Sequence, residues 1–153
     1  MKFVIQRVSE ASVEVEGKAI GRIGTGFLVL IGVCDKDDEA ACEKMVKKML
    51  GLRIFADADG KTNLNIDAVG GGVLLVSQFT LYADCRHGNR PSFTDAGSPE
   101  HAEKLYDYIC SLCRERLGDA RVATGSFGAE MKVSLVNDGP FTIVLDSEQL
   151  GIN

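Results

Sequence analysis

The feature that most constrains the fold is a short run of apolar residues, Phe27 to Ile31, with a glycine on either side. Successive side chains of a strand point to opposite faces, so a run that is apolar at every position predicts a strand buried on both faces. The near-continuous apolar stretch Phe27–Cys34 has eight residues. A membrane-spanning helix needs about 20. We therefore expect a sheet built around this segment and no membrane partner.

The neighbouring segments predict both strands and helices. Residues 2–33 are expected to form consecutive strands, because valines alternate with glutamates at 13–16 and glycines separate the segments. One helix is predicted over 37–50, where apolar residues recur at helical spacing. A second begins at the Ser-Pro pair 98–99 and stops at Gly118. Further strands are predicted at 53–55, 73–81, 121–124, 132–136 and 141–145.

The order of these segments predicts the class of fold. Strands that follow one another favour antiparallel or mixed pairing over a doubly wound parallel sheet. A chain of 153 residues suits one domain of common size, and no linker or repeat divides it. We expect a single compact α/β domain over residues 1–153, with antiparallel or mixed sheets and two main helices.

Charge and cysteine content limit the partners and the compartment. With 17 Lys and Arg against 22 Asp and Glu, the formal net charge is −5. This balance argues against a broad basic surface around duplex DNA, but it allows a small patch that holds one nucleic-acid end. Five cysteines cannot all pair, and the first residues lack a signal-peptide hydrophobic segment. We expect reduced thiols and a cytoplasmic protein.

Several short motifs carry little weight. Cys110 and Cys113 form a C-x-x-C pair deep in the second predicted helix, whereas the redox motif places its first thiol at a helix N-terminus. Asp57–Gly60 resembles part of a calcium loop but would put Phe55 at the first ligand position. The triple glycine at 70–72 precedes a strand, where a phosphate-binding loop would follow one. No Gly-x-Ser-x-Gly motif is present. We expect neither a metal nor a cofactor.

Two polar segments are better candidates for a site. Ser77–Thr80 ends an apolar strand with two hydroxyls, an amide and an aromatic ring. Asn137–Thr142 contains Gly-Pro, and its composition favours a reverse turn, although a cis bond there would redirect the backbone carbonyls. Between them, residues 82–97 form a polar loop of a length that is often functional.

In combination, these segments resemble the signature of the D-aminoacyl-tRNA deacylase family, formerly named D-tyrosyl-tRNA deacylase. The resemblance covers nearly the whole chain. It rests on five segments that occur in order, namely Val4–Val8, Ser77–Leu81, Gly88–Phe93, Phe127–Val133 and Val136–Pro140.

The resemblance implies a barrel-like α/β domain that works as a homodimer, with its active sites at the subunit interface. The Gly139–Pro140 peptide would be cis and would enter the partner subunit's site, with Arg7 bracing it. A related group holds this peptide trans and has relaxed chirality, and Arg7 favours the strict group. The substrate would be the ester of a D-amino acid with the terminal ribose of tRNA, and the products the free D-amino acid and tRNA.

An aminoacyl ester is already activated, so positioning and oxyanion stabilisation would suffice for its hydrolysis. The catalytic segment would then comprise Ser77, Gln78, Phe79 and Thr80. Backbone amides near Phe79 and Thr80 would supply donors, and the ribose hydroxyl would activate water. Thr80 is interpreted as a positioning residue. Its alternative role as nucleophile lacks a base beside it in the sequence.

The residues that the resemblance assigns to substrate binding are Arg7, Phe127, Met131, Gly139 and Pro140. Rigid carbonyls at Gly139–Pro140 would bind the α-amino group and clash with an L side chain. Glycine has no side chain to exclude, so glycyl-tRNA would also be hydrolysed. Arg86 and Arg90 in the polar loop would contact tRNA, with few phosphate contacts in total.

Two other interpretations stay open. One is the trans-proline relative, which removes L-alanine wrongly attached to threonine tRNA. The other is a non-catalytic RNA- or DNA-binding module on the same fold. Matched D and L esters separate the first from our prediction, and binding without ester turnover would support the second.

Overall fold

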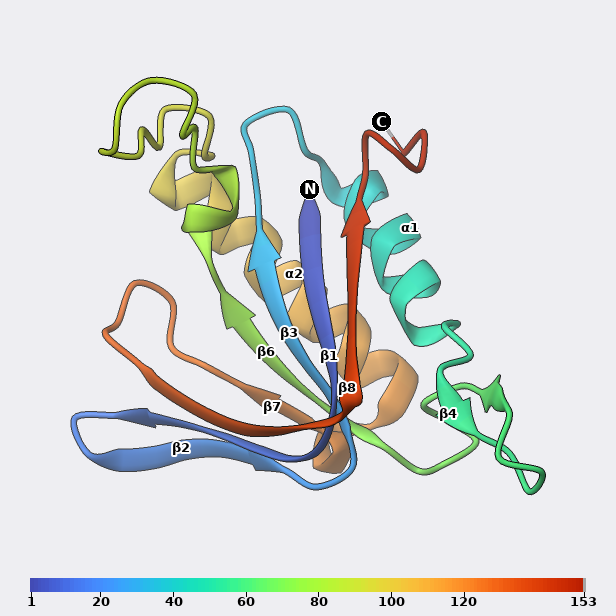
Figure 1. The fold of residues 1–153 in the computed structure, drawn as a ribbon. Coiled ribbons are helices and arrows are strands. Elements are labelled where there is room, and N and C mark those ends of the chain that lie inside the picture. The colour runs from blue at the N-terminus through green and yellow to red at the C-terminus, as the bar shows by residue number, and fades with distance from the viewer. Residues whose placement is uncertain (153) are drawn as a thin grey trace.

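Two long strands, β1 (Lys2–Val15) and β8 (Lys132–Asp146), pair antiparallel along almost their whole length and organise the fold. The first half of β1 also pairs with β3 (Gly26–Gly32), and its second half with β2 (Lys18–Ile23). β1 is therefore shared by both parts of one bent sheet (Figure 1). The computed structural model describes residues 1–152, so the last residue of the expected domain, Asn153, lies outside the described residues.

Parallel strands extend this sheet on the other side of β3. β6 (Gly72–Ser77) pairs in parallel with β3, and β7 (Val122–Thr124) pairs in parallel with β6. The sheet curls until β2 reaches β7. The two strands approach so closely that a methyl group added at Gly21 would lie 3.1 Å from the carbonyl oxygen of Thr124. The expected α/β domain with mixed pairing and a barrel-like shape is thus confirmed. β4 (Phe55–Ala56) and β5 (Thr62–Leu64) form a separate small hairpin.

The structure has the two main helices that were expected, and both cover one face of the sheet (Figure 1). α1 (Glu39–Leu50) begins two residues later than predicted, because Asp38 is its cap and accepts the Ala41 N–H at 2.8 Å. α2 (Pro99–Leu117) ends at Gly118, which adopts φ 83°. Ser98 is the N-cap of α2 and Pro99 its first residue, as the Ser-Pro pair predicts, but the Ser98 side chain makes no capping hydrogen bond. The backbone N–H of Ser98 donates to Asp35 instead.

Apolar side chains form two clusters on the two faces of the bent sheet. The first lies between the sheet and the helices and includes Phe3, Phe27 and Met45. The second lies inside the curl and includes Val8, Val13, Leu28 and Leu74. β3 contributes to both clusters, since Phe27 belongs to one and Leu28 to the other. The prediction of a central strand buried on both faces is confirmed.

The structure corrects two of the strand predictions, one in its length and one in the number of strands. The strand predicted over 73–81 ends at Ser77, and the chain continues as a short 3-10 helix, η1 (Phe79–Tyr82). The Gln78 N–H donates to Ile31, next to the end of β3, so a longer β6 would have no strand to pair with. The segments 132–136 and 141–145 are one strand, β8, and the chain does not reverse between them.

The segment 138–141 is a bulge in β8. Gln6 pairs with Thr142 and Val8 with Asn137, so four residues of β8 stand opposite the single residue Arg7. A bulge bends its strand and leaves the extra residues unpaired. The reverse turn that composition favoured is therefore wrong.

The short strand expected at 53–55 begins only at Phe55.

We predict that Gly26→Ala destabilises the domain severely, whereas Gly24→Ala does not. A methyl group at Gly26 would lie 1.8 Å from the Gly72 carbonyl oxygen, and its φ of 157° disfavours alanine. The added methyl at Gly24 would meet nothing within 4 Å. We expect urea denaturation to show a loss of more than about 3 kcal/mol for the first variant and less than about 1 for the second. Equal losses would contradict this account of the β3–β6 contact.

Candidate active site

A cavity of about 700 Å³ opens at the carboxyl ends of the parallel strands β3 and β6. This edge is where open α/β sheets bind ligands. The start of α2 and the loop that follows β7 complete the wall. The side chains that line it are mainly apolar and include Ile31, Val33, Phe93, Ala102, Phe127 and Met131.

The predicted segment Ser77–Thr80 forms one rim of this cavity. Ser77, Gln78 and Phe79 line it, whereas Thr80 does not. Thr80 is tied to the rim because its Oγ1 accepts a hydrogen bond from the Gln78 amide at 2.7 Å. The first N–H groups of η1, on Phe79 and Thr80, have no acceptor among the described residues, as is usual at the start of a helix. The start of η1, next to the cavity rim, thus has two adjacent backbone N–H groups without an acceptor.

The loop after β7 brings two more predicted residues to the cavity. Phe127 lies against the ring of Tyr106, with the ring centroids 6.0 Å apart, and lines the cavity. The sulfur of Met131 accepts the Ser126 N–H at 3.4 Å, which folds the loop back on itself. Tyr106 is fixed in turn, because its hydroxyl donates to the carbonyl of Leu75 in β6.

Arg7 and the bulge of β8 form a second group. The guanidinium donates from Nε to the Asp138 carbonyl at 2.9 Å and from Nη1 to the Ile54 carbonyl at 2.6 Å. It also lies over the ring of Phe141, 4.6 Å from the centroid. The Gly139–Pro140 peptide is cis, and both residues are exposed. Arg7 therefore holds the bulge from both of its flanks.

The two groups lie apart within one chain. Neither Arg7 nor Gly139–Pro140 lines the cavity. Arg7 pairs with Phe27 at the start of β3, whereas the cavity begins at Ile31. Four residues of strand separate these positions by about 13 Å. The structure thus brings together the predicted residues of each group but does not join the groups.

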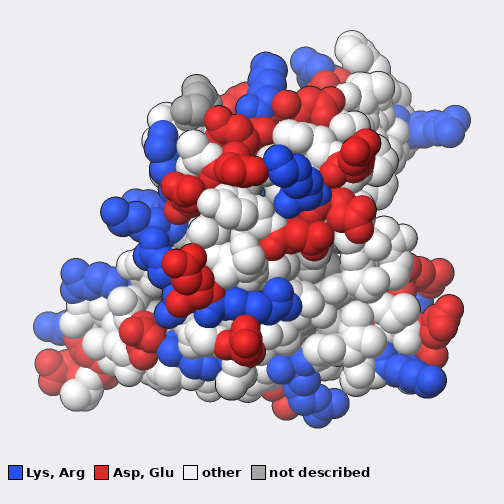
Figure 2. Space-filling view, turned by 180° about the vertical axis from the view of Figure 1, so that it is seen from behind, with Lys and Arg blue, Asp and Glu red and all other residues white. Residues whose placement is uncertain are grey.

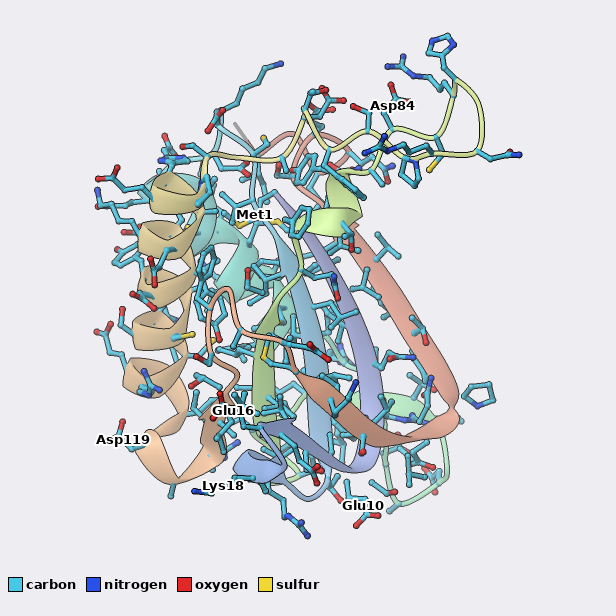
Figure 3. All side chains as sticks on the ribbon, turned by 90° about the vertical axis from the view of Figure 1, so that its left-hand side faces the viewer. Met1, Glu10, Glu16, Lys18, Asp84 and Asp119 are labelled. Carbon is cyan, nitrogen blue, oxygen red and sulfur yellow. The ribbon has the colours of Figure 1, made fainter. Side chains whose placement is uncertain are left out.

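The polar loop 82–97 extends beyond the end of the sheet and is closed by a bridge between Asp84 and Ser92 (Figure 3). Arg86 donates to both carboxylate oxygens of Asp84, at 2.8 and 2.7 Å. These bonds lower the pKa of Asp84 to about 2. The charge of Arg86 is therefore largely matched within the loop. Arg90 is exposed and makes no ion pair within residues 1–152.

Three residues that contribute to these two groups were not identified as site residues in the sequence analysis. Asn137 closes the neck of the bulge, because its Oδ1 accepts the Phe141 N–H at 2.8 Å. Phe93 packs edge-on against Phe79 at the cavity rim, 5.2 Å between centroids. Both lie in segments that carry the resemblance, which was their only signal. Ile54 acts through its carbonyl, so no side-chain pattern could reveal it.

Other chemistry has little support in the described part of the chain. Cys110 and Cys113 are buried in α2, so the C-x-x-C pair belongs to the core. Within residues 1–152, no three His, Cys, Asp or Glu side chains gather as a metal site would require. None of the described helices is long and apolar enough to span a membrane.

The structure is that of an α/β protein with a cavity at the carboxyl edge of its sheet, and comparison with known proteins gives the family. The model for D-Tyr-tRNA(Tyr) deacylase matches residues 4–146. A protein of Thermosipho melanesiensis named D-aminoacyl-tRNA deacylase is 52% identical over 98% of this chain and 99% of its own length. A protein of the same name from Escherichia coli O81 is 54% identical over 95% of this chain and 99% of its own. The chain therefore belongs to the D-Tyr-tRNA(Tyr) deacylase family, a family of hydrolases.

Solved structures agree on the fold. One described as c-Myc DNA Unwinding Element Binding Protein superposes with a TM-score of 0.91 at 41% identity, over 96% of this chain and 99% of that one. One described as a probable eukaryotic D-amino acid tRNA deacylase has a TM-score of 0.83 at 20% identity, over 94% and 97% of the two chains. At that lower identity the likeness concerns the fold alone.

We predict that the C-x-x-C thiols are unreactive in the folded protein. Burial raises the pKa of Cys110 to about 11 and that of Cys113 to about 12, so both stay protonated at about pH 8. Cys85 is exposed. Iodoacetamide at about pH 8 should modify Cys85 and spare both α2 thiols, as read by peptide mass mapping. Labelling of Cys110 as fast as Cys85, with urea-unfolded protein as the reference, would contradict the burial.

Proposed function

We propose that this protein hydrolyses the ester of D-aminoacyl-tRNA, which yields the free D-amino acid and free tRNA. The observation that carries the proposal is the 52–54% identity, over 95% or more of the chain, to proteins named D-aminoacyl-tRNA deacylase. The geometry agrees with it, because an apolar cavity lies beside two free backbone donors at the end of β6.

In this proposal the ester carbonyl lies against the start of η1. Water attacks the carbonyl carbon, and the N–H groups of Phe79 and Thr80 stabilise the oxyanion. Collapse of the intermediate breaks the ester bond, and the leaving ribose oxygen takes up a proton. The neighbouring ribose hydroxyl takes a proton from the attacking water and gives its own proton to the leaving ribose oxygen, so it relays the proton and ends unchanged. Positioned donors suffice here because the ester is already activated.

The contacts of Thr80 favour a positioning role. A nucleophilic hydroxyl needs a base within hydrogen-bond reach. The Oγ1 of Thr80 instead accepts a bond from the Gln78 amide, which cannot take a proton. That bond fixes the turn whose N–H groups would bind the oxyanion. Ser77 and Gln78 line the cavity next to it. We therefore assign all four residues of Ser77–Thr80 to the reaction centre, with the backbone as the acting group.

The cavity itself would hold the nucleoside end of the substrate. Its volume of about 700 Å³ lies within the range of small-molecule sites. Phe127 and Met131 offer flat and polarisable surfaces on its wall. An adenine base stacks well on such side chains. Arg86 and Arg90 would contact the nearby phosphates, Arg90 more strongly because Arg86 is paired with Asp84.

Chiral selection would require a second copy of the chain. Gly139–Pro140 is exposed and lies away from the cavity of its own chain. A twofold dimer can place this bulge in the cavity of the partner subunit and create two equivalent sites. There its carbonyls would accept bonds from the α-ammonium group and exclude an L side chain. Glycyl-tRNA, which has no side chain to exclude, would be hydrolysed as well.

A cytoplasmic location stays a prediction from the sequence.

A second candidate function is nucleic-acid binding without turnover. It is favoured by one observation, the name of the structural relative described as a DNA unwinding element binding protein. The trans-proline relative that edits L-alanyl-tRNA is a further alternative. One experiment distinguishes these alternatives from the proposed function, because each predicts hydrolysis of a different set of aminoacyl-tRNA esters.

We predict that purified protein removes D-tyrosine from tRNA and spares matched L-tyrosyl-tRNA. Release of labelled amino acid should differ between the enantiomers by at least about a hundredfold, since the wrong side chain meets backbone that cannot move aside. Hydrolysis of neither ester, with retained tRNA binding, would support the binding module. Hydrolysis of L-alanyl-tRNA(Thr) would favour the trans-proline relative.

We predict that Gly139→Ala lowers kcat/KM for the D-ester at least about tenfold and leaves the fold intact. The alanine methyl would lie 3.0 Å from the Phe141 nitrogen and 3.2 Å from Nη2 of Arg7, at an unfavourable φ of 138°. The bulge would shift, but it lies on the surface. Circular dichroism and urea denaturation check the fold, and hydrolysis of the D-ester measures the effect.

Mixing variants tests whether the site is shared between subunits. Gly139→Ala and the double variant Gln78→Ala/Thr80→Ala are each expected to be impaired. If each site takes one group from either chain, co-refolded heterodimers contain one intact site. A statistical mixture should then recover about a quarter of wild-type activity. No recovery, or an active monomer in sedimentation, would contradict the shared site.

A further inference from the structure

Three lysines on α1 form an exposed basic surface that the proposed reaction does not use. Lys44, Lys47 and Lys48 line a surface depression of about 420 Å³, together with Gly51, Leu52 and Ile152. Their spacing of three and four residues puts them on one side of the helix. We call these three residues the lysine face. In Figure 2, basic side chains gather along the left-hand edge, and acidic side chains lie next to them toward the middle of the face.

The lysine face has no close ion-pair partner in the described part of the chain. None of the three lysines makes an ion pair within residues 1–152, whereas Lys104 is paired with Glu39 and Lys132 with Glu130. Like charges at this helical spacing repel each other. Lys47 and Lys48 lie in the last turn, where a positive charge suits the helix dipole. Lys44 lies before that turn, so the dipole does not explain the full set.

The lysine face is connected to the bulge that would complete the active site. Leu52, at the edge of the depression, is two residues from Ile54, so their Cα atoms lie within about 7 Å. The Ile54 carbonyl accepts a 2.6 Å bond from Arg7, and Arg7 binds the Asp138 carbonyl beside Gly139–Pro140. The segment that follows α1 is therefore linked to the bulge through Arg7.

We propose that the lysine face binds the phosphate backbone of the tRNA whose aminoacyl end lies at Gly139–Pro140. This inference rests on the proposed function and extends it, because it assigns a docking surface for the body of the substrate. In the dimer, the chain that supplies the bulge to a site also supplies the lysines for the tRNA in that site. A protein with a net charge of −5 then attracts a polyanion through a local surface.

The test compares two charge reversals that change the net charge equally. Lys47→Glu/Lys48→Glu alters the lysine face, and Lys18→Glu/Arg22→Glu alters exposed positions on β2. Fluorescence anisotropy with labelled tRNA measures binding at several salt concentrations. We expect the first variant to bind at least about fivefold more weakly than the control at low salt. The slope of log K against log salt should fall by about 1.4–1.8, the value for two lost phosphate contacts.

Kinetics separates docking from chemistry. For D-tyrosyl-tRNA, the lysine variant should raise KM and leave kcat unchanged. For D-tyrosyl-adenosine, which has the ester but no phosphate backbone, it should match the wild type. Equal binding by both variants, or an equal loss on both substrates, would overturn the inference. The neutral variant Lys47→Gln/Lys48→Gln, with an unchanged melting curve, serves if the glutamates disturb α1.

The two proposals fail in different ways. If the wild type does not hydrolyse D-tyrosyl-tRNA, the proposed function is wrong, and the anisotropy measurement still tests the lysine face. If the wild type is active and the lysine variant binds tRNA like the control, the active site stands and the docking surface does not.

Discussion

The antiparallel pairing of β1 with β8 is the interaction on which the rest of the structure depends, because it holds at both ends and is interrupted in the middle. It runs from Lys2 opposite Asp146 to Glu14 opposite Lys132, and four residues of β8 bulge opposite Arg7. The interruption bends the sheet, so that β1 contributes to the core under the helices and to the core inside the curl. The same interruption exposes Gly139–Pro140. One local mismatch in strand length thus shapes the fold and presents the segment assigned to chiral selection.

At the other end of the sheet, the proposed chemistry depends on how β6 ends. After Ser77 the chain turns into η1, and the turn leaves the N–H groups of Phe79 and Thr80 free. The Gln78 side chain fixes that turn through Thr80, and Phe93 supports it from the polar loop. An oxyanion site made of backbone donors needs no perturbed side chain. This explains why neither a triad nor a metal group is required for the proposed hydrolysis of an activated ester.

The spacing of apolar residues predicted the helices, whose hydrogen bonds are local, and the central strand β3, which is buried on both faces. The helices and the buried β3 followed from 3.6-residue and continuous apolar patterns. The same reasoning failed at Ser77–Thr80 and at Asn137–Thr142, because both conformations depend on distant partners. β6 ends next to the end of β3, and the bulge exists because β8 has more residues than β1 opposite Arg7. The Asn-Asp-Gly-Pro composition fits a turn and a bulge alike. Phe127 and Met131 came from the family resemblance, since nothing local links them to residues fifty positions earlier.

The charge distribution shows why net charge predicts so little about substrate. The overall value of −5 suits a protein that avoids indiscriminate contact with nucleic acid. Locally, Arg86 is paired with Asp84, while Lys44, Lys47 and Lys48 of α1 make no ion pair within residues 1–152. A few unpaired cations give a shallow dependence of binding on salt and a modest affinity. For an enzyme whose product is free tRNA, modest affinity for the tRNA body speeds release. In the proposed mechanism, selectivity then comes from the ester end of the substrate, where the Gly139–Pro140 backbone would contact the amino acid.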